Sequence, residues 1–283
     1  MSFSPNSEGQ ILAPSPHEGS DSHQDLRQND QPPPDRSQSR RGRNLFTAPA
    51  TYILVGINCA VFLWMIFHGV SPKEPTTYQL VHYGATNPDL ILSGQWWRLL
   101  TAIFVHVGLI HIATNMWCLW NLGLLGEPLL GPFGLAAVYV LTGVAGNLLS
   151  LAVNVIFRDH DSVGAGASGA VFGIAGILIV LLSNHKLPIP WTELKRLRRS
   201  VIQFAGLNLV IGLATVFTNI IRIDNFAHLG GFICGLGMGV PLIPRMTSGR
   251  ERYLRRQKLT FAAFAFFLSL FGYFISSLKL VDR

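Results

Sequence analysis

The sequence has little charge and almost no cysteine. Only 13% of its 283 residues are charged, and its fifteen Asp and Glu residues fall outside the long apolar runs or at their edges. An ionised carboxylate is costly within lipid, so this placement is typical of a protein that crosses a membrane several times. The three cysteines, Cys59, Cys118 and Cys234, lie in apolar runs, and their odd number and scattered spacing exclude a disulfide framework or a cysteine metal motif.

The signals of several other functional classes are also missing. His17-Glu18 begins a His-Glu-x-x-His zinc motif that is not completed. The apolar runs hold no paired Asp for aspartyl chemistry and no carboxylate that would couple ions in a transporter. The N-terminus lacks the apolar stretch of a cleavable signal peptide. We expect no metal, nucleotide or other cofactor, and no nucleic-acid partner.

Hydrophobic residues make up 49% of the chain. Many of them lie in seven apolar segments, each close in length to the roughly 20 residues that a membrane span requires. The predicted spans are 50–70, 105–125, 133–157, 168–182, 201–219, 226–242 and 260–278. The fold class is therefore predicted to be all-α, a polytopic membrane helix bundle with six core spans and one C-terminal span. The long segment 71–104 contains Trp96 and Trp97, and we expect it to lie partly in the membrane interface.

Composition and charge divide the chain into three parts. Residues 1–47 are predicted to be a disordered cytoplasmic tail, 48–244 the six-helix core, and 245–283 a basic cytoplasmic loop followed by a seventh transmembrane helix. Five Lys and Arg residues lie in the tail, five between the fourth and fifth spans, and six between the sixth and seventh. With seven spans these segments share one side. The positive-inside rule makes that side the cytoplasm, and we expect the cell (inner) membrane.

This orientation places the polar residues of three spans in one leaflet. Spans two, four and six all enter from the non-cytoplasmic side. Their N-terminal ends carry His106, His111 and Asn115 on span two, Ser168 on span four, and His228 on span six. His106 is expected to be more exposed and structural. Span four rises only about 22 Å against a hydrocarbon core of roughly 30 Å. Ser168 is therefore predicted to lie below the outer surface.

Ser168 and His228 have the chemistry of a nucleophile and its base. A serine hydroxyl needs a base to take its proton, and a helix N-terminus offers N–H groups that stabilise negative charge. Gly166 leaves room for a substrate backbone. Without an acidic residue in a span to orient the histidine, we interpret the pair as a dyad. His111 and Asn115 share a helix face and are candidate oxyanion donors.

Two rows of glycines, one on each span, could bring Ser168 and His228 together. Each motif also has a purely structural interpretation. The two seams are Gly169, Gly173 and Gly176 on one span and Gly231, Gly235 and Gly239 on the other. Small residues let helix backbones approach closely. Taken alone, Ser168 is better read as a small packing residue in a Gly/Ala seam. His228, His111 and Asn115 are each also read as helix-end or interhelical hydrogen-bonding groups.

Taken together, the motifs resemble those of the rhomboid intramembrane serine proteases. They are His111-Ile-Ala-Thr-Asn115, Gly166-Ala-Ser168-Gly169, Ala227-His228-Leu-Gly230-Gly231 and Trp97-Arg98. The resemblance covers residues 50–243. It implies Ser168 as nucleophile, His228 as base, and an oxyanion site of His111, Asn115 and the Ser168 N–H. It further implies that Trp97-Arg98 supports the first loop, and that the substrates are single-span membrane proteins cleaved near the outer leaflet of the bilayer.

Two features depart from the pattern that this resemblance implies. Phe172 stands where a tyrosine is often found, and its ring is expected to stack under His228 all the same. The seventh span has no polar site residue, so we assign it a peripheral role. Two readings compete with the protease: a catalytically inactive rhomboid-like protein that binds membrane clients, and a transporter.

Overall fold

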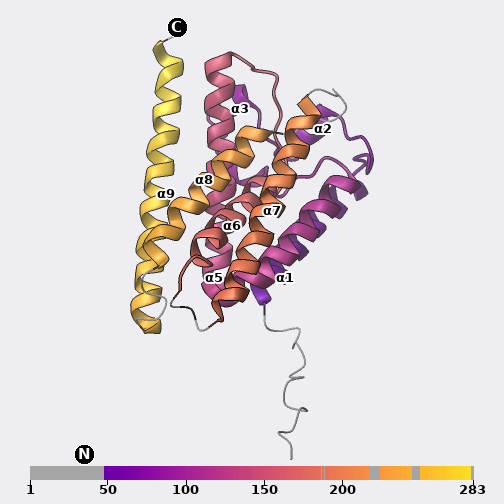
Figure 1. Ribbon diagram of the computed structural model, residues 1–283. Coiled ribbons are helices and arrows are strands. Elements are labelled where there is room, and N and C mark those ends of the chain that lie inside the picture. The colour runs from indigo at the N-terminus through magenta and orange to yellow at the C-terminus, as the bar shows by residue number, and fades with distance from the viewer. Residues whose placement is uncertain (1–47, 186, 188, 217–223, 244–248, 282–283) are drawn as a thin grey trace, which may run out of the picture. The chain divides into compact units, whose positions relative to one another are not determined.

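The fold is a bundle of α-helices. A computed structural model describes residues 48–185, 187, 189–216, 224–243 and 249–281. The helices of these residues are α1 (Pro49–Phe67), α2 (Thr77–His82), α3 (Pro88–Leu92), α4 (Arg98–Thr101), α5 (Leu109–Phe157), α6 (Ser168–Leu181), α7 (Trp191–Val216), α8 (Asn225–Leu242) and α9 (Arg250–Val281) (Figure 1). No strand forms among them. The all-α prediction is confirmed, while the predicted tail, 1–47, lies outside the described residues.

Four of the described helices are long and apolar enough to cross a membrane. They are α1, α5, α8 and residues 250–278 of α9. Helix α6 is apolar but has only 14 residues, a rise of about 21 Å. Helices α1, α6 and α8 begin within one residue of the predicted spans. The polytopic helix bundle predicted from the sequence is therefore present.

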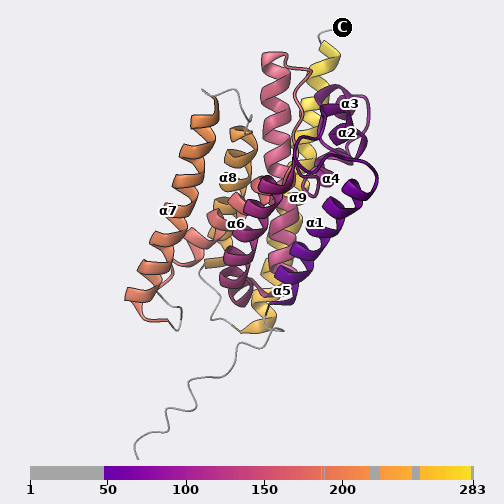
Figure 2. The same cartoon turned by 90° about the vertical axis from the view of Figure 1, so that its right-hand side faces the viewer.

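The second and third predicted spans are the two arms of α5. Gly131 has non-helical dihedral angles, φ 75° and ψ 166°, between Pro128 and Pro132. A Cβ on Gly126 would lie 3.5 Å from Leu135 Cδ1, a distance that a straight helix does not allow nine residues apart. The chain therefore reverses at Gly131, and both views show the arms side by side (Figures 1 and 2).

The reversal defines the two ends of the bundle. Helices α6 and α8 begin at one end, here called the site end, and α1, α7 and α9 begin at the opposite end. At the opposite end Glu127 of α5, only 3% exposed, accepts hydrogen bonds from Ala50 N (2.9 Å), Thr51 N (2.8 Å) and Thr51 Oγ1 (2.7 Å). This carboxylate binds the N–H groups that the first turn of α1 leaves free.

Helices α7 and α9 begin about ten residues before their predicted spans. The basic segments that the sequence suggested as loops are therefore partly helical. In α7, Leu194, Val201 and Ala205 are buried at helical spacing despite the surrounding Lys and Arg. In α9, Tyr253 Oη and Gln257 Nε2 donate to carbonyl oxygens beside the α5 reversal, Leu129 at 3.2 Å and Leu130 at 2.8 Å.

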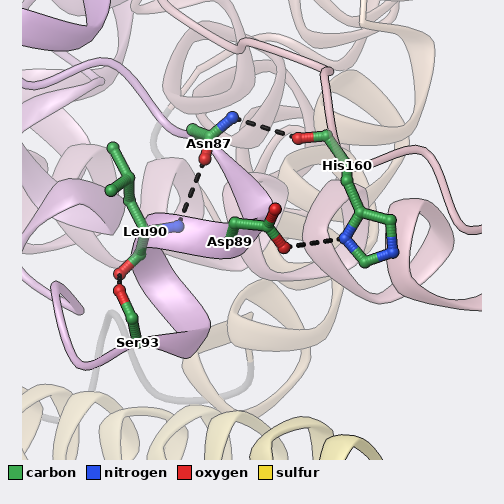
Figure 3. Close-up of polar contacts among 5 residues, drawn as sticks. All are labelled: Asn87, Asp89, Leu90, Ser93 and His160. Atoms are coloured by element: carbon green, nitrogen blue, oxygen red, sulfur yellow. Dashed lines mark hydrogen bonds and ion pairs between the residues drawn. The ribbon is translucent and has the colours of Figure 1, made fainter.

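Segment 71–104 folds at the site end into three short helices. Thr76 and Gln79 form a capping box for α2, and Asn87 caps α3 by accepting from Leu90 N. Figure 3 shows that Asn87 also donates to the carbonyl of His160, whose ring lies 2.8 Å from Asp89. These contacts join segment 71–104 to the loop that leads into α6. The Asp89–His160 pair is exposed, so its own contribution to stability is small.

Helix α6 lies at the centre and packs most extensively against α8 and α5. Gly169 and Gly176 face the backbone of α8 as the two seams predict, whereas a Cβ on Gly173 would overlap Thr142 of α5. A Cβ on Gly231 would overlap the carbonyl oxygen of Gly169, and one on Gly235 would overlap that of Gly173. Gly239 instead faces the side chain of Val180. The seams thus bring the backbones of α6 and α8 into direct contact.

Candidate active site

Ser168 is the first residue of α6 and is half-buried. The extended segment before it is bonded to segment 71–104. Gly164 pairs with Thr86 through both backbone groups, and Gly166 N donates to the carbonyl of Ala102 at 2.9 Å. Gly166 has φ +131°, a conformation that side chains disfavour. The backbone leading to the serine is therefore held from outside α6.

His228 lies in the first turn of α8 and stacks on Phe172. The two rings are 4.4 Å apart at 15°, as the sequence led us to expect for this phenylalanine. Phe172 is four residues after Ser168, so the two residues share a face of α6. The imidazole thus covers the face that carries the hydroxyl. No hydrogen bond joins Ser168 to His228 among the described residues. In enzymes, catalytic hydrogen bonds are often long or poorly aligned until the substrate binds.

His111, in the first turn of α5, lies against the same segment. A Cβ on Gly166 would be 2.6 Å from His111 Cε1 and 2.9 Å from Nε2. Val107 N donates to His111 Nδ1 at 3.3 Å, so Nδ1 is an acceptor and a neutral ring carries its proton on Nε2. The edge of the ring nearest Gly166 therefore carries Nε2–H, a hydrogen-bond donor.

Asn115 and His106 occupy the interior next to His111. Asn115 is 6% exposed, and its Nδ2 donates to the carbonyl of His111 at 2.9 Å, leaving a second hydrogen on that nitrogen. His106 was expected to be more exposed, but it is fully buried, with Nδ1 3.1 Å from the carbonyl oxygen of Phe104.

Trp97 and Arg98 lie in segment 71–104. Arg98 is 6% exposed, and its guanidinium donates to the carbonyls of Val81 (2.6 Å) and Ala85 (3.0 Å) and to Gln95 Oε1 (2.8 Å). Its carbon lies 4.6 Å from the centre of the Trp97 ring. These contacts fold the segment and make no direct contribution to the serine–histidine pair.

Asp224 and Ser150 are neighbours of the site that the sequence reasoning missed. Asp224 caps α8: its Oδ1 accepts from Ala227 N at 2.9 Å, and its Oδ2 accepts from Ser150 Oγ at 2.5 Å. An Asp directly before a helical run is an N-cap signal, and this signal could have identified Asp224. Ser150 carries no signal of its own. No cluster of His, Cys, Asp or Glu suited to a metal ion occurs in the part of the chain that the structure describes.

Comparison with known proteins identifies the family. The family model for the Rhomboid domain matches residues 93–245. The chain belongs to the rhomboid family. Rhomboid protease GluP of Bacillus subtilis is 33% identical over 221 residues, covering 76% of this chain and 39% of that protein. For Rhomboid-like protease 2 of Toxoplasma gondii the identity is 32%, covering 66% and 63%. For Rhomboid protease AarA of Providencia stuartii it is 30%, covering 68% and 72%.

The rhomboid match and the apolar helices together make this chain an integral membrane protein. The match runs from segment 71–104 to the end of α8, so it includes Ser168, His228, His111 and Asn115. Helices α1 and α9 lie outside it. The chain spans less than two thirds of the length of the first two relatives named above, 39% of one and 63% of the other.

Proposed function

We propose that this rhomboid is an intramembrane serine endopeptidase that cleaves single-span membrane proteins. The observation that carries the proposal is the His228–Phe172 stack, because it places the imidazole over the face of α6 that begins with Ser168. The His111 ring against Gly166 accepts from Val107 N through Nδ1, which leaves Nε2–H as a donor at the same place. A client-binding protein would need neither group.

In the proposed reaction the Ser168 oxygen attacks the carbonyl carbon of the scissile bond, and His228 takes the hydroxyl proton. The oxyanion receives hydrogen bonds from the Ser168 backbone N–H, His111 Nε2 and Asn115 Nδ2, each donor being worth about 100- to 1000-fold in turnover. His228 then protonates the departing amine, and water hydrolyses the acyl ester. The substrate helix must unwind locally, because helical hydrogen bonds shield its carbonyls.

The proposed orientation places the site end toward the outer leaflet and the N-terminus in the cytoplasm. It is supported by the basic residues at the starts of α7 and α9, which both lie at the opposite end (Figure 2). They are Lys195, Arg196, Arg198, Arg199, Arg250, Arg252, Arg255, Arg256 and Lys258. Cytoplasmic segments carry such an excess.

The test is cleavage of a transmembrane reporter in proteoliposomes. Ser168→Ala and His228→Ala should each abolish cleavage, and both should leave the thermal unfolding of the protein unchanged. A fluorophosphonate probe should label the native protein and fail to label Ser168→Ala. Cleavage that persists in either variant would overturn the dyad. A native protein that binds the reporter but is neither labelled nor active would favour the client-binding alternative.

A further inference from the structure

Among the residues that the structure describes, the imidazole of His228 has no acidic partner. Its Nδ1 is buried and has no hydrogen-bond partner among the described residues. In a serine protease triad an acid bonds this nitrogen and fixes the ring. Here the ring is positioned by the Phe172 stack beneath it and by the backbone that carries it. The start of α8 therefore determines where the base lies.

Asp224 controls that start through three hydrogen bonds. Its side chain accepts from Ala227 N, and its carbonyl accepts from His228 N at 3.2 Å. The second carboxylate oxygen accepts from Ser150 Oγ of α5 at 2.5 Å. One residue thus joins the backbone on which His228 is built to a neighbouring helix. Ser150 is 8% exposed, so water competes little for this bond.

Close backbone packing sets the distance between α8 and α5 in the same turn. A Cβ on Gly146 would overlap the carbonyl oxygen of Ala227, and one on Gly230 would lie 2.9 Å from that of Ala145. Smooth glycine contacts of this kind bring helices together but do not prevent one from turning against the other. The Asp224–Ser150 hydrogen bond adds a directional contact at the same level.

We propose that Asp224 is a positioning residue for His228, acting with Ser150 to fix the rotation of the first turn of α8. The proposal rests on the proposed protease function and deepens it. No acid among the described residues bonds the imidazole. Asp224 instead holds the first turn of α8, which carries the imidazole.

The experiment measures kcat and KM for a reporter, the rate of fluorophosphonate labelling, and thermal unfolding. Ser150→Ala and Asp224→Ala should each lower kcat by roughly 10- to 100-fold, since small misplacements of a catalytic group cost this much. KM should change by less than about twofold. Labelling of Ser168 should slow in parallel, because it reports the nucleophile without a substrate helix.

Two matched variants separate positioning from stability. Asp224→Asn keeps an acceptor for Ala227 N and a side chain that can bond Ser150, so it should restore kcat to within about threefold of native. Thr51→Ala removes a hydroxyl–carboxylate bond of the same kind at the opposite end. It should lower the unfolding temperature as Ser150→Ala does and leave kcat unchanged.

The outcomes distinguish the two proposals. An active native protein in which Ser150→Ala and Asp224→Ala label at the native rate would overturn the positioning role alone. The same follows if Thr51→Ala loses as much kcat as Ser150→Ala, or if Asp224→Asn is as slow as Asp224→Ala. Cleavage that survives Ser168→Ala would instead overturn the protease function. If Asp224→Ala does not fold, Ser150→Ala decides.

Discussion

Two carboxylates tie helix starts to α5, one at each end of the bundle. At the opposite end Glu127 of α5 receives the first N–H groups of α1. At the site end Asp224 caps α8 and receives the hydroxyl of Ser150 of α5. Both use the same chemistry, because a helix start leaves N–H groups that need an acceptor and lipid provides none.

The two carboxylates differ in burial and in their neighbours. Glu127 is 3% exposed, and its three hydrogen bonds lie far along α5 from His111. Asp224 is half-buried and lies one turn before His228. We therefore expect the same kind of contact to serve fold stability at one end and, as proposed above, site geometry at the other. Variants should therefore separate the two effects.

The largest loss of activity is expected when a side chain is placed in the glycine seam between α6 and α8. Gly231→Leu would push α8 away from α6, because even a Cβ there overlaps the Gly169 carbonyl. We expect cleavage and fluorophosphonate labelling to fall more than roughly 100-fold. Gly56→Leu is the matched control, since nothing lies within 4 Å of a Cβ on Gly56 of α1. Native rates in Gly231→Leu would show that the seam does not position His228.

At the opposite end, the largest loss of stability is expected from Glu127→Ala. Three donors of α1 lose their acceptor, and we expect a loss of about 3 kcal/mol in the free energy of unfolding. Chemical denaturation in detergent micelles measures this loss. Glu127→Gln should lose less, because the amide oxygen still accepts, and exposed Glu74→Ala should lose nothing measurable. The folded fraction of Glu127→Ala should cleave at the native rate, and a matching loss of kcat would erase the contrast between the ends.

A smaller effect is expected where α9 meets the α5 reversal. Gln257→Ala removes the hydrogen bond to Leu130 O, and we expect a loss of about 1 kcal/mol in unfolding free energy with unchanged kcat. Ser269→Ala, on the exposed side of the same helix, should change neither quantity. A reduced kcat in Gln257→Ala would contradict the peripheral role that the sequence suggested for the seventh helix.

Much of the bundle was predictable because it depends on local pattern. Long apolar runs indicated α1, the arms of α5, α6 and α8 within a few residues. The starts of α7 and α9 were missed because their first turns are densely charged, and only packing of Leu194 and Tyr253 on the core reveals them as helix. The exposure of His106 was misjudged because burial depends on which parts of the fold pack around a residue, and no local pattern records that packing.

The sequence by itself determined the helical, membrane-spanning class and the residues at the starts of α5, α6 and α8, since hydrophobic length and glycine spacing are readable along one segment. Only the tertiary structure decided the partners of the two carboxylates. Asp224 meets Ser150 across 74 residues, and Glu127 meets Ala50 across 77. No periodicity links positions so far apart, so their pairing follows from how the helices pack.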